Sequence, residues 1–546
     1  MRTSKEVKQS APSWHAKAIS YLICLFLVLA VTGCHGVSSN VSVNEWYVSA
    51  GNNASDENPG THDRPFRSVR KALSVTKPGD MVVFSAGTYP CAEEKSPDGS
   101  PGLTVILRSA GDGKVEFSGD GSQNLLVPGS YTTITGIEFT MTKDNPKRDG
   151  IYILRKEHIN ISNCRFFACN VGVKIFSSHH LSIQNCEMAF SGRYGVHMIG
   201  SGDGSEGHWD PADENSWVEI RNCWMHDAGW NVEGAEGYGI TSNGAVEYLV
   251  IENCQIDNNS GDGILYEDWG IHTTARYNVI RGTGVAAIWI DNASMSIFDN
   301  NFLYGNNVGI WLSGEEDFAN RYLNDLISIR NNIIVHNDWA AIDTSLYGRN
   351  TILLSQATRD VYFDNNTVAF NNCSNVVSIQ RRPPLTEFRN IWFRNNIFWD
   401  NSGGVGIDSG LDTAGIHFQN NLWSTPYKGD SRARTGDPAF VDPNASTPEG
   451  YRLKSGSAAI DAGMLIYENP LDFWNGQRPH LPKTGVSGMK ISDMKTGVYA
   501  LPKNGIYDIG AHESGTTGKA HIGLDLTTFP FEVTPFKLQF KAKPKR

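Results

Sequence analysis

An alternation of apolar and polar positions recurs along the chain from about residue 160 to residue 425. Each copy reads apolar, variable, Asn, Asn or Cys, variable, apolar; the copies are ISNCRF, IQNCEM, IRNCWM, IENCQI, FDNNFL, IRNNII, FDNNTV, FRNNIF and FQNNLW. The first Asn of successive copies lies at Asn163, Asn185, Asn222, Asn253, Asn300, Asn331, Asn365, Asn395 and Asn420, and Asn278 of RYNVI falls between the fourth and fifth. Several intervals are 22 to 25 residues, and the longer ones fit the same period with a loop inserted. The pattern indicates one repeated structural unit.

A second apolar run precedes most copies and is usually opened by a small residue. These runs are GIYIL, GVKIF, GVHMI, GITSN, GILYE, AIWID and GIWLS. Two or three short β runs per repeat, separated by Asn and Gly and without helical periodicity, predict one coil of a parallel β-helix. We expect the Asn series to form a single inward column in which side-chain amides bond along the axis.

Four cysteines share one position of the repeat, directly after the Asn. They are Cys164, Cys186, Cys223 and Cys254. Free Cys behaves as a small buried hydrophobe, so this register predicts core filling rather than redox chemistry.

Two further segments resemble bacterial pectate-lyase-like proteins with a right-handed β-helix. EWYVSAGNNASDENPGTHDRPFRSVRKALSVTKPGDMVVFSAGTYP, residues 45–90, looks like their opening segment. DPAFVDPNASTPEGYRLKSGSAAIDAG and the later DIGAHE look like their closing segment. The resemblance implies an all-β, right-handed parallel β-helix over residues 46–425, closed by residues 426–546. That superfamily includes lyases, hydrolases, epimerases and binding proteins, so the resemblance says little about activity.

A short amphipathic helix is expected near the start of the solenoid. Phe66, Val69, Ala72 and Leu73 follow helical spacing, so one helix face is apolar. Such a helix can cover the open end of the first coil, which would otherwise be an exposed sheet edge.

The N-terminus reads as an export segment. Basic residues precede an apolar run over residues 18–30, and Val31-Thr32-Gly33-Cys34 resembles a bacterial lipobox. The run is shorter than the roughly 20 residues of a spanning helix. We expect a signal peptide over 1–33, a linker over 34–45 and a lipid on Cys34, which anchors the exported protein at a bacterial membrane, either the outer membrane or the cell surface. An uncleaved anchor is the alternative.

The net charge is −11, the pI is about 5.8, and the only basic run is the final KAKPKR. Nucleic-acid binding needs a basic surface, so a nucleic-acid partner is not expected. We expect a monomer whose partners are a polysaccharide or oligosaccharide and, through the lipid, a membrane.

The alternation within the second runs defines two outward columns. Because neighbouring side chains in a strand face opposite ways, one column reads Tyr152, Lys174, His197, Thr241, Leu265, Trp289, Trp311. The other reads Leu154, Phe176, Ile199, Asn243, Glu267, Asp291, Ser313. Glu267 and Asp291 are therefore expected side by side on adjacent coils.

Two carboxylates in this register suit acid–base chemistry. Adjacent strands lie about 4.7 to 4.9 Å apart, so one pKa of the pair should rise. The spacing is near the roughly 5 to 5.5 Å of retaining glycosidases. Asp268 is the reserve for Glu267, because a bulge in YEDW would exchange them. Capping of a turn is the structural alternative for both acids.

Residues around this pair are candidates for substrate binding. The Trp rings could stack on sugars, and loops before and after the pair would make a groove. The candidates are Trp289, Trp311, His197, Lys174, Asn243 and Ser313.

Strand ends like GIWLD, with a nucleophilic Asp, occur in β-helix β-xylosidases, and Asp291 matches that Asp. The partner departs from the pattern, since the family has its Glu one coil later, where this chain has Ser313 and carries Glu267 one coil earlier. The resemblance makes Asp291 the nucleophile and Glu267 the acid/base.

Three functions stay open. A glycoside hydrolase with two carboxylates needs no cofactor, a polysaccharide lyase could use Ca²⁺, and a non-catalytic glycan binder needs neither. No pair of adjacent acids marks a calcium site on the expected floor, and His208 with Asp210 makes a weak metal-ligand set.

Overall fold

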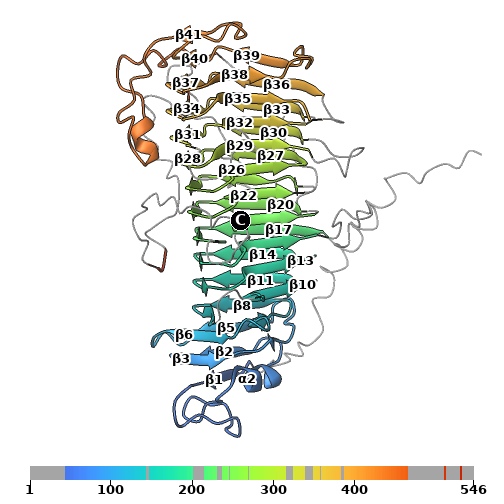
Figure 1. The fold of residues 1–546 in the computed structure, drawn as a ribbon. Helices are drawn as coiled ribbons and strands as arrows, with labels where there is room; N and C mark the ends of the chain where they lie inside the picture. The colour runs from blue at the N-terminus through green and yellow to red at the C-terminus, as the bar shows by residue number, and fades with distance from the viewer. Residues whose placement is uncertain are drawn as a thin grey trace, which may run out of the picture. The chain divides into compact units, whose positions relative to one another are not determined.

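The computed structural model describes residues 43–142, 147–200, 214–229, 236–244, 246–267, 270–314, 324–338, 349–356, 358–382, 387–464, 466, 510–511 and 529–531. The strands belong to one compact unit, Asn44–Arg546. They form three parallel sheets, called A, B and C here, and the chain visits A, B and C in turn on each coil (Figure 1). No helix among the described residues is long and apolar enough to cross a membrane.

Sheet A has fifteen strands. They are β1 (Glu45–Val48), β2 (Met81–Phe84), β5 (Val105–Ser109), β8 (Thr132–Thr135), β11 (Glu157–Ser162), β14 (His179–Gln184), β17 (Asn215–Arg221), β20 (Val246–Glu252), β23 (Gly270–Ile271), β24 (Thr274–Arg276), β27 (Ala293–Asp299), β30 (Asn324–Arg330), β33 (Thr358–Asp364), β36 (Phe388–Arg394) and β39 (Ile416–Gln419).

Sheet B has fourteen strands. They are β3 (Gly87–Pro90), β6 (Val115–Gly119), β9 (Glu138–Met141), β12 (Arg165–Phe167), β15 (Glu187–Ala189), β18 (Trp224–His226), β21 (Gln255–Asp257), β25 (Val279–Arg281), β28 (Phe302–Tyr304), β31 (Ile333–Val335), β34 (Thr367–Ala369), β37 (Ile397–Trp399), β40 (Leu422–Trp423) and β41 (Arg434–Thr435).

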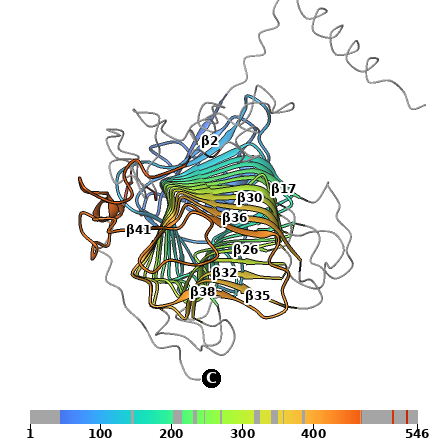
Figure 2. The ribbon, with the colours of Figure 1, turned by 90° about the horizontal axis from the view of Figure 1, so that it is seen from above.

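Sheet C, which carries the candidate site, has twelve strands. They are β4 (Glu94–Lys95), β7 (Leu126–Val127), β10 (Ile151–Leu154), β13 (Val171–Phe176), β16 (Tyr194–Ile199), β19 (Tyr238–Asn243), β22 (Ile264–Glu267), β26 (Ala286–Asp291), β29 (Val308–Ser313), β32 (Asn350–Ser355), β35 (Asn375–Gln380) and β38 (Gly404–Ile407). Figure 2 shows successive coils stacked over one another. The predicted right-handed parallel β-helix is confirmed.

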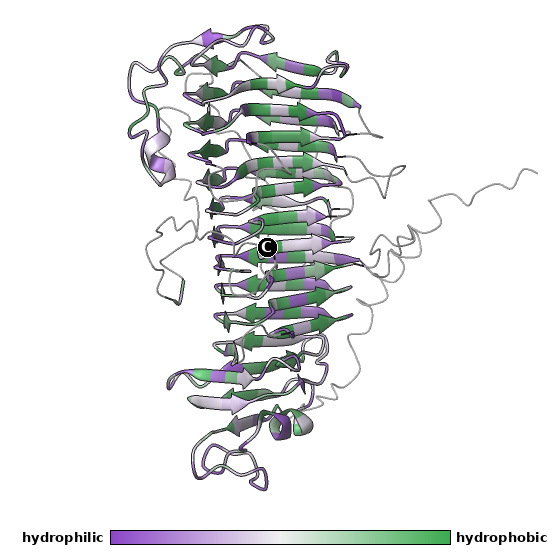
Figure 3. Cartoon of the chain, viewed as in Figure 1, coloured by the Kyte–Doolittle hydropathy of each residue, from purple (hydrophilic) through white to green (hydrophobic). Residues whose placement is uncertain are grey.

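Apolar side chains from all three sheets fill the interior, and polar residues alternate with them along many strands (Figure 3). The small residue that opens the strands of sheet C has a steric cause. A Cβ on Gly239 would lie 2.5 Å from Ile256 Cγ2, and one on Gly263 would lie 2.4 Å from Ile280 Cγ2. These positions point into the packed core, where there is no space for a larger side chain.

The capping helix is also confirmed. Helix α2 (Val69–Val75) begins after Ser68, whose Oγ accepts a hydrogen bond from the Lys71 amide at 3.1 Å. Val69, Ala72 and Leu73 are buried, and Phe66 is buried just before the helix.

The predicted inward column of first Asn residues is wrong. All nine, from Asn163 to Asn420, have a left-handed backbone (φ 51 to 57°), and Asn163 is exposed. Asn tolerates this conformation better than most residues, which suits it to the turn between sheets A and B. The side chain of the next residue points inward instead. A single inward column therefore holds the four cysteines and then Asn278, Asn301, Asn332, Asn366, Asn396 and Asn421.

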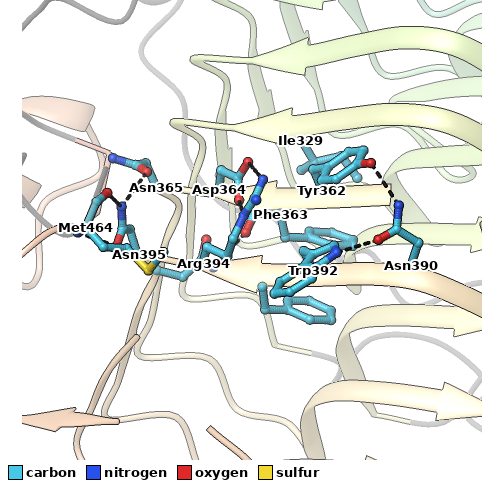
Figure 4. Close-up of polar contacts among 12 residues, drawn as sticks. Ile329, Tyr362, Phe363, Asp364, Asn365, Asn390, Trp392, Arg394, Asn395 and Met464 are labelled. Carbon is cyan, nitrogen blue, oxygen red and sulfur yellow. Dashed lines mark hydrogen bonds and ion pairs between the residues drawn. The ribbon is translucent and has the colours of Figure 1, made fainter. Parts of the chain in front are cut away.

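The amide ladder ends on an acid of the closing segment. Asn421 Nδ2 donates to Asp430 Oδ2 at 2.8 Å, and Trp423 Nε1 donates to the same oxygen at 3.0 Å. A short 3₁₀ helix, η3 (Pro448–Tyr451), follows. The closing segment also binds the turns: Asn395 Nδ2 donates to the Met464 carbonyl at 2.8 Å (Figure 4).

Candidate functional site

The outward columns of sheet C have the predicted register. Lys174 pairs with His197, His197 with Thr241, Asn243 with Glu267, and Trp289 with Trp311. Asp291 pairs with Ser313 on the other side of β26. Loops inserted between coils leave the register unchanged, because parallel strands pair coil by coil whatever the length of the connection.

Glu267 and Asp291 end the adjacent strands β22 and β26 and differ in exposure. The strands pair as far as Tyr266 and Ile290, which places the two acids at the next step of the same register. Glu267 is half-buried, whereas Asp291 is only 1% exposed. Of the two, Glu267 is the one with a substantial exposed surface.

Glu267 is held by a polar chain that crosses three strands. Asn243 on β19 donates its Nδ2 to Glu267 Oε2, and Asn243 Oδ1 lies 2.7 Å from Nε2 of His197 on β16. His197 is 8% exposed, so it is not a solvated surface residue. Burial lowers the pKa of His197 to about 4; the bond with Asn243 opposes this decrease, and the charges of Lys174 and Arg193 add to it.

Two tyrosines extend this group of residues: Tyr194 packs against His197, and Tyr238 packs against Tyr194. The sequence analysis missed both. The Tyr194 ring centroid lies 4.4 Å from that of His197 and 5.3 Å from that of Tyr238. Tyr238 donates its hydroxyl to Glu236 Oε2 at 2.6 Å. Burial raises the pKa of Tyr194, Arg193 opposes this, and the charges of Glu267 and Glu236 add to the rise. The dipeptide Tyr-Gly opens both β16 and β19, and this shared position was the available signal.

Asp262 is a second residue that the sequence analysis missed. It lies in the turn before β22, is fully buried, and accepts the Ala286 amide at 2.7 Å through Oδ1. Its Oδ2 has no hydrogen-bond partner among the residues that the structure describes. Burial raises the pKa of Asp262 well above its ordinary value, and the charges of Glu236 and Glu267 add to the rise. The buried carboxyl group of Asp262 therefore ionises less readily than an exposed aspartate does.

The two tryptophans of sheet C stack on each other. Their ring centroids are 4.0 Å apart and the rings are nearly parallel, at 6°. Trp289 Nε1 donates to Ser313 Oγ at 2.7 Å. Trp311 is 1% exposed and packs with Val308 and Leu353, so the expectation that both rings line an open floor is wrong for Trp311. Trp289 is half-buried and retains exposed surface.

Several predicted features lie outside the described residues. They are Cys34, Asp268, His208, Asp210 and parts of the loops that were expected to flank the acids. Among the residues that are described, no cluster of three or more His, Cys, Asp or Glu side chains has a metal-binding arrangement.

Comparisons with known proteins agree with this architecture. The family model described as "Right handed beta helix region" matches residues 113–280 and 149–327, and "Protein of unknown function (DUF1565)" matches residues 50–101. No curated protein matches the sequence. The matched model and the three parallel sheets agree that the chain is a right-handed parallel β-helix protein.

Similar solved structures include carbohydrate-active enzymes of several kinds. The PL6 family alginate lyase AlyGC has a TM-score of 0.52 at 15% identity, over 76% of this chain and 57% of that chain. The GH136 lacto-N-biosidase from Eubacterium ramulus has a TM-score of 0.46 at 13% identity, over 67% of each chain. Pectate lyase Pel9A has a TM-score of 0.39 at 16% identity, over 87% of this chain and 97% of that chain. At these identities the likeness is one of fold.

Proposed function

We propose that the protein is a carbohydrate-active enzyme that cleaves glycosidic bonds, and specifically a glycoside hydrolase in which Glu267 is the acid/base and Asp291 the nucleophile. The observation that carries this proposal is the register of the two acids at the ends of β22 and β26. Strands lie about 4.7 to 4.9 Å apart, close to the separation of roughly 5 to 5.5 Å at which retaining enzymes hold their carboxyl groups.

The reaction would proceed in two steps. Asp291 attacks the anomeric carbon while Glu267 gives its proton to the leaving oxygen, and a glycosyl–enzyme ester forms. Glu267, now a carboxylate, then takes a proton from the water that cleaves this ester. Because Asp291 is 1% exposed, its covering side chains must move when the sugar binds.

Two substitutions test the assignment. Asp291→Asn keeps the shape and removes the charge, so turnover should fall by orders of magnitude while folding is retained. Glu267→Gln should spare substrates whose leaving groups need no protonation, and added azide should restore its second step. Asp408→Asn is the matched control, since Asp408 follows strand β38 of the same sheet and is exposed. Near-parental activity in both site variants would show that the pair is structural.

A lyase is the second candidate, and one observation favours it. Within the described residues, Lys174 and Arg193 form no ion pair, although both lie close enough to act on His197. Such cations could neutralise the carboxylate of a uronate, and Tyr194 could remove the neighbouring proton.

Product chemistry separates the two candidates. A lyase leaves an unsaturated, ultraviolet-absorbing end, a hydrolase leaves a saturated one, and a glycan binder leaves the polymer intact. We expect saturated products and no loss of rate with a chelator. A large loss that Ca²⁺ reverses would favour the lyase.

Anchoring at a bacterial membrane through a lipid on Cys34 is part of the proposal, and its support is the lipobox-like sequence alone. Cys34→Ala should move the protein from the membrane fraction to the soluble fraction. Unchanged membrane retention with an intact N-terminus would overturn the lipid anchor.

A further inference from the structure

The chain of polar contacts behind Glu267 has a fixed direction. Asn243 Nδ2 donates to Glu267 Oε2, and this is the only direction open when Glu267 is ionised, because a carboxylate only accepts hydrogen bonds. The amide oxygen of Asn243 then faces His197, and Nε2 of His197 must carry a proton in order to donate across the 2.7 Å contact. Each link determines the orientation of the next.

The other ring nitrogen of His197 agrees with this direction. Nδ1 is buried and has no hydrogen-bond partner among the described residues. Burial lowers the pKa of His197 to about 4, so near neutral pH the ring is uncharged. An uncharged imidazole has one proton, and Nε2 is the nitrogen with an acceptor.

We propose that His197 and Asn243 are positioning residues for Glu267: the imidazole holds the amide in one orientation, and the amide keeps an N–H donor on Oε2 of the carboxylate. The inference rests on the proposed role of Glu267 as acid/base. A donor at this place favours the ionised carboxylate, which is the form that Glu267 takes after it has protonated the leaving oxygen. The same contact restricts the rotation of the carboxyl group, which a precise proton transfer requires.

Other titratable groups lie near Glu267 and act on it together with this chain. Tyr194 and Glu236 lie on the β16 and β19 side, and Asp262 precedes its own strand. Asp291 is the register neighbour on β26. A negative charge on any of these acids would disfavour ionisation of Glu267, whereas an N–H donor on its carboxylate favours ionisation.

The main test replaces the amide by a carboxylate of the same shape. Asn243→Asp removes the donor and sets a like charge beside Glu267, so the pKa of Glu267 should rise by about one to three units. The measurement is ¹³C NMR of the full chain labelled at the glutamate side-chain carboxyl, in which Glu267→Gln identifies the signal. Asn375→Asp is the matched control, because Asn375 is a half-buried Asn of the same sheet that donates to Asn350. It lies five strands from Asn243, or about 24 Å.

Two substitutions of His197 test whether its hydrogen bond orients the amide of Asn243. In His197→Gln the new amide can still donate to Asn243 Oδ1, so the pKa of Glu267 should stay at the parental value. In His197→Met that donor is absent, the amide of Asn243 can turn, and the pKa of Glu267 should rise, by less than in Asn243→Asp. Equal pKa values of Glu267 in the two variants would show that His197 does not determine the orientation of the Asn243 amide.

A pH profile separates positioning from a structural role. As the acid, Glu267 must be protonated, so in Asn243→Asp the alkaline limb of kcat/KM should move upward by the change measured for the pKa. A purely structural role would lower the rate at every pH and leave the limb in place. A parental pKa of Glu267 in Asn243→Asp overturns the inference. If the pKa moves but parent and variants cleave no glycan, the contact stands and the hydrolase proposal fails.

Discussion

The early and late coils of the solenoid fill the same inward turn position with different chemistry. Four coils carry Cys164, Cys186, Cys223 and Cys254, and the next six carry Asn278, Asn301, Asn332, Asn366, Asn396 and Asn421. Both types reach back to a main-chain carbonyl of the preceding coil. Cys254 Sγ lies 3.6 Å from the Ile220 oxygen, and Asn278 Nδ2 lies 3.0 Å from the Ile251 oxygen.

The difference is the number of contacts that each residue makes. Asn332 donates to the Phe298 carbonyl and to Asn366 Oδ1, and its own Oδ1 accepts from the backbone amide and the Nδ2 of Asn301. A thiol is a weak donor and a weak acceptor, so a Cys coil relies on packing instead. The junction is at Cys254, whose amide donates to Asn278 Oδ1 at 2.9 Å.

The candidate acids lie on either side of this junction. Glu267 follows Cys254 in the last cysteine coil, and Asp291 follows Asn278 in the first asparagine coil. The change from Cys to Asn in the interior and the two outward acids therefore lie on the same two coils. Substitutions in the inward column can test whether the cysteine half and the asparagine half differ in stability as their contacts indicate.

The largest effect is expected in the asparagine half. Asn332→Ala leaves the Asn301 amide buried without its acceptor, at a cost of about 1 to 3 kcal/mol, and it removes the side-chain donor to the Phe298 carbonyl. The free energy of unfolding should fall by about 3 to 5 kcal/mol. Urea unfolding of parent and variant measures it, and a loss below about 1 kcal/mol would contradict the ladder's role.

A smaller loss is expected in the cysteine half. Cys223 is fully buried, and Cys223→Ala removes one sulfur atom from the core and leaves a small cavity. We expect the free energy of unfolding to fall by about 1 to 2 kcal/mol at pH 7. If this loss in urea unfolding equals or exceeds that of Asn332→Ala, the comparison between the halves fails.

Alkaline pH should destabilise the cysteine half. Burial raises the pKa of the Cys223 thiol well above its ordinary value, so the folded protein holds this proton to higher pH than the unfolded chain does. The unfolded chain loses that proton above about pH 8.5, and stability should then fall by about 1.4 kcal/mol per pH unit for each such thiol. Unfolding at pH 7 and pH 9.5 should show a smaller decrease in Cys223→Ala than in the parent. An identical decrease would show that the thiol titrates alike in both states.

The smallest change in stability is expected for a substitution that adds one more Asn to the end of the asparagine ladder. In Cys254→Asn the new amide has Asn278 Oδ1 and the Ile220 carbonyl within reach, so stability should change by less than about 1 kcal/mol. Cys164→Asn is the matched control, because its neighbour is Cys186, which offers no amide oxygen. We expect the control to be the less stable variant. If Cys254→Asn had the lower thermal midpoint of the two variants, the inference that the asparagine ladder can be extended at Cys254 would be contradicted.

The register of the outward columns could be predicted because it depends only on alternation within strands. Asn243, Glu267 and Asp291 are separated by 24 residues at each step, and each ends its strand. Strand ends align once coils stack in parallel, so the sequence was sufficient to bring the acids together. The same reasoning failed for the Asn series, because a left-handed residue at the turn interrupts the alternation, and its side chain points outward.

Residues outside the aligned runs could not be placed in the site from their own segment. Asp262 lies in a turn, where nothing local indicates that burial and two neighbouring acids will act on it.

Trp311 alternates outward like Trp289, yet it is buried. Whether an outward side chain is covered depends on which other segments pack over it, and alternation carries no information about that.

The repeat, the parallel β-helix, the capping helix and the register of Glu267 with Asp291 could all be derived from the amino-acid sequence, because each follows from periodicity and local conformational preference. Three features could be seen only in the folded protein: which Asn enters the ladder, that Asp291 is buried while Glu267 is partly exposed, and that His197 reaches Glu267 through Asn243. These depend on side-chain directions and on packing between coils, and hydrogen-bond geometry is set only when three strands lie side by side.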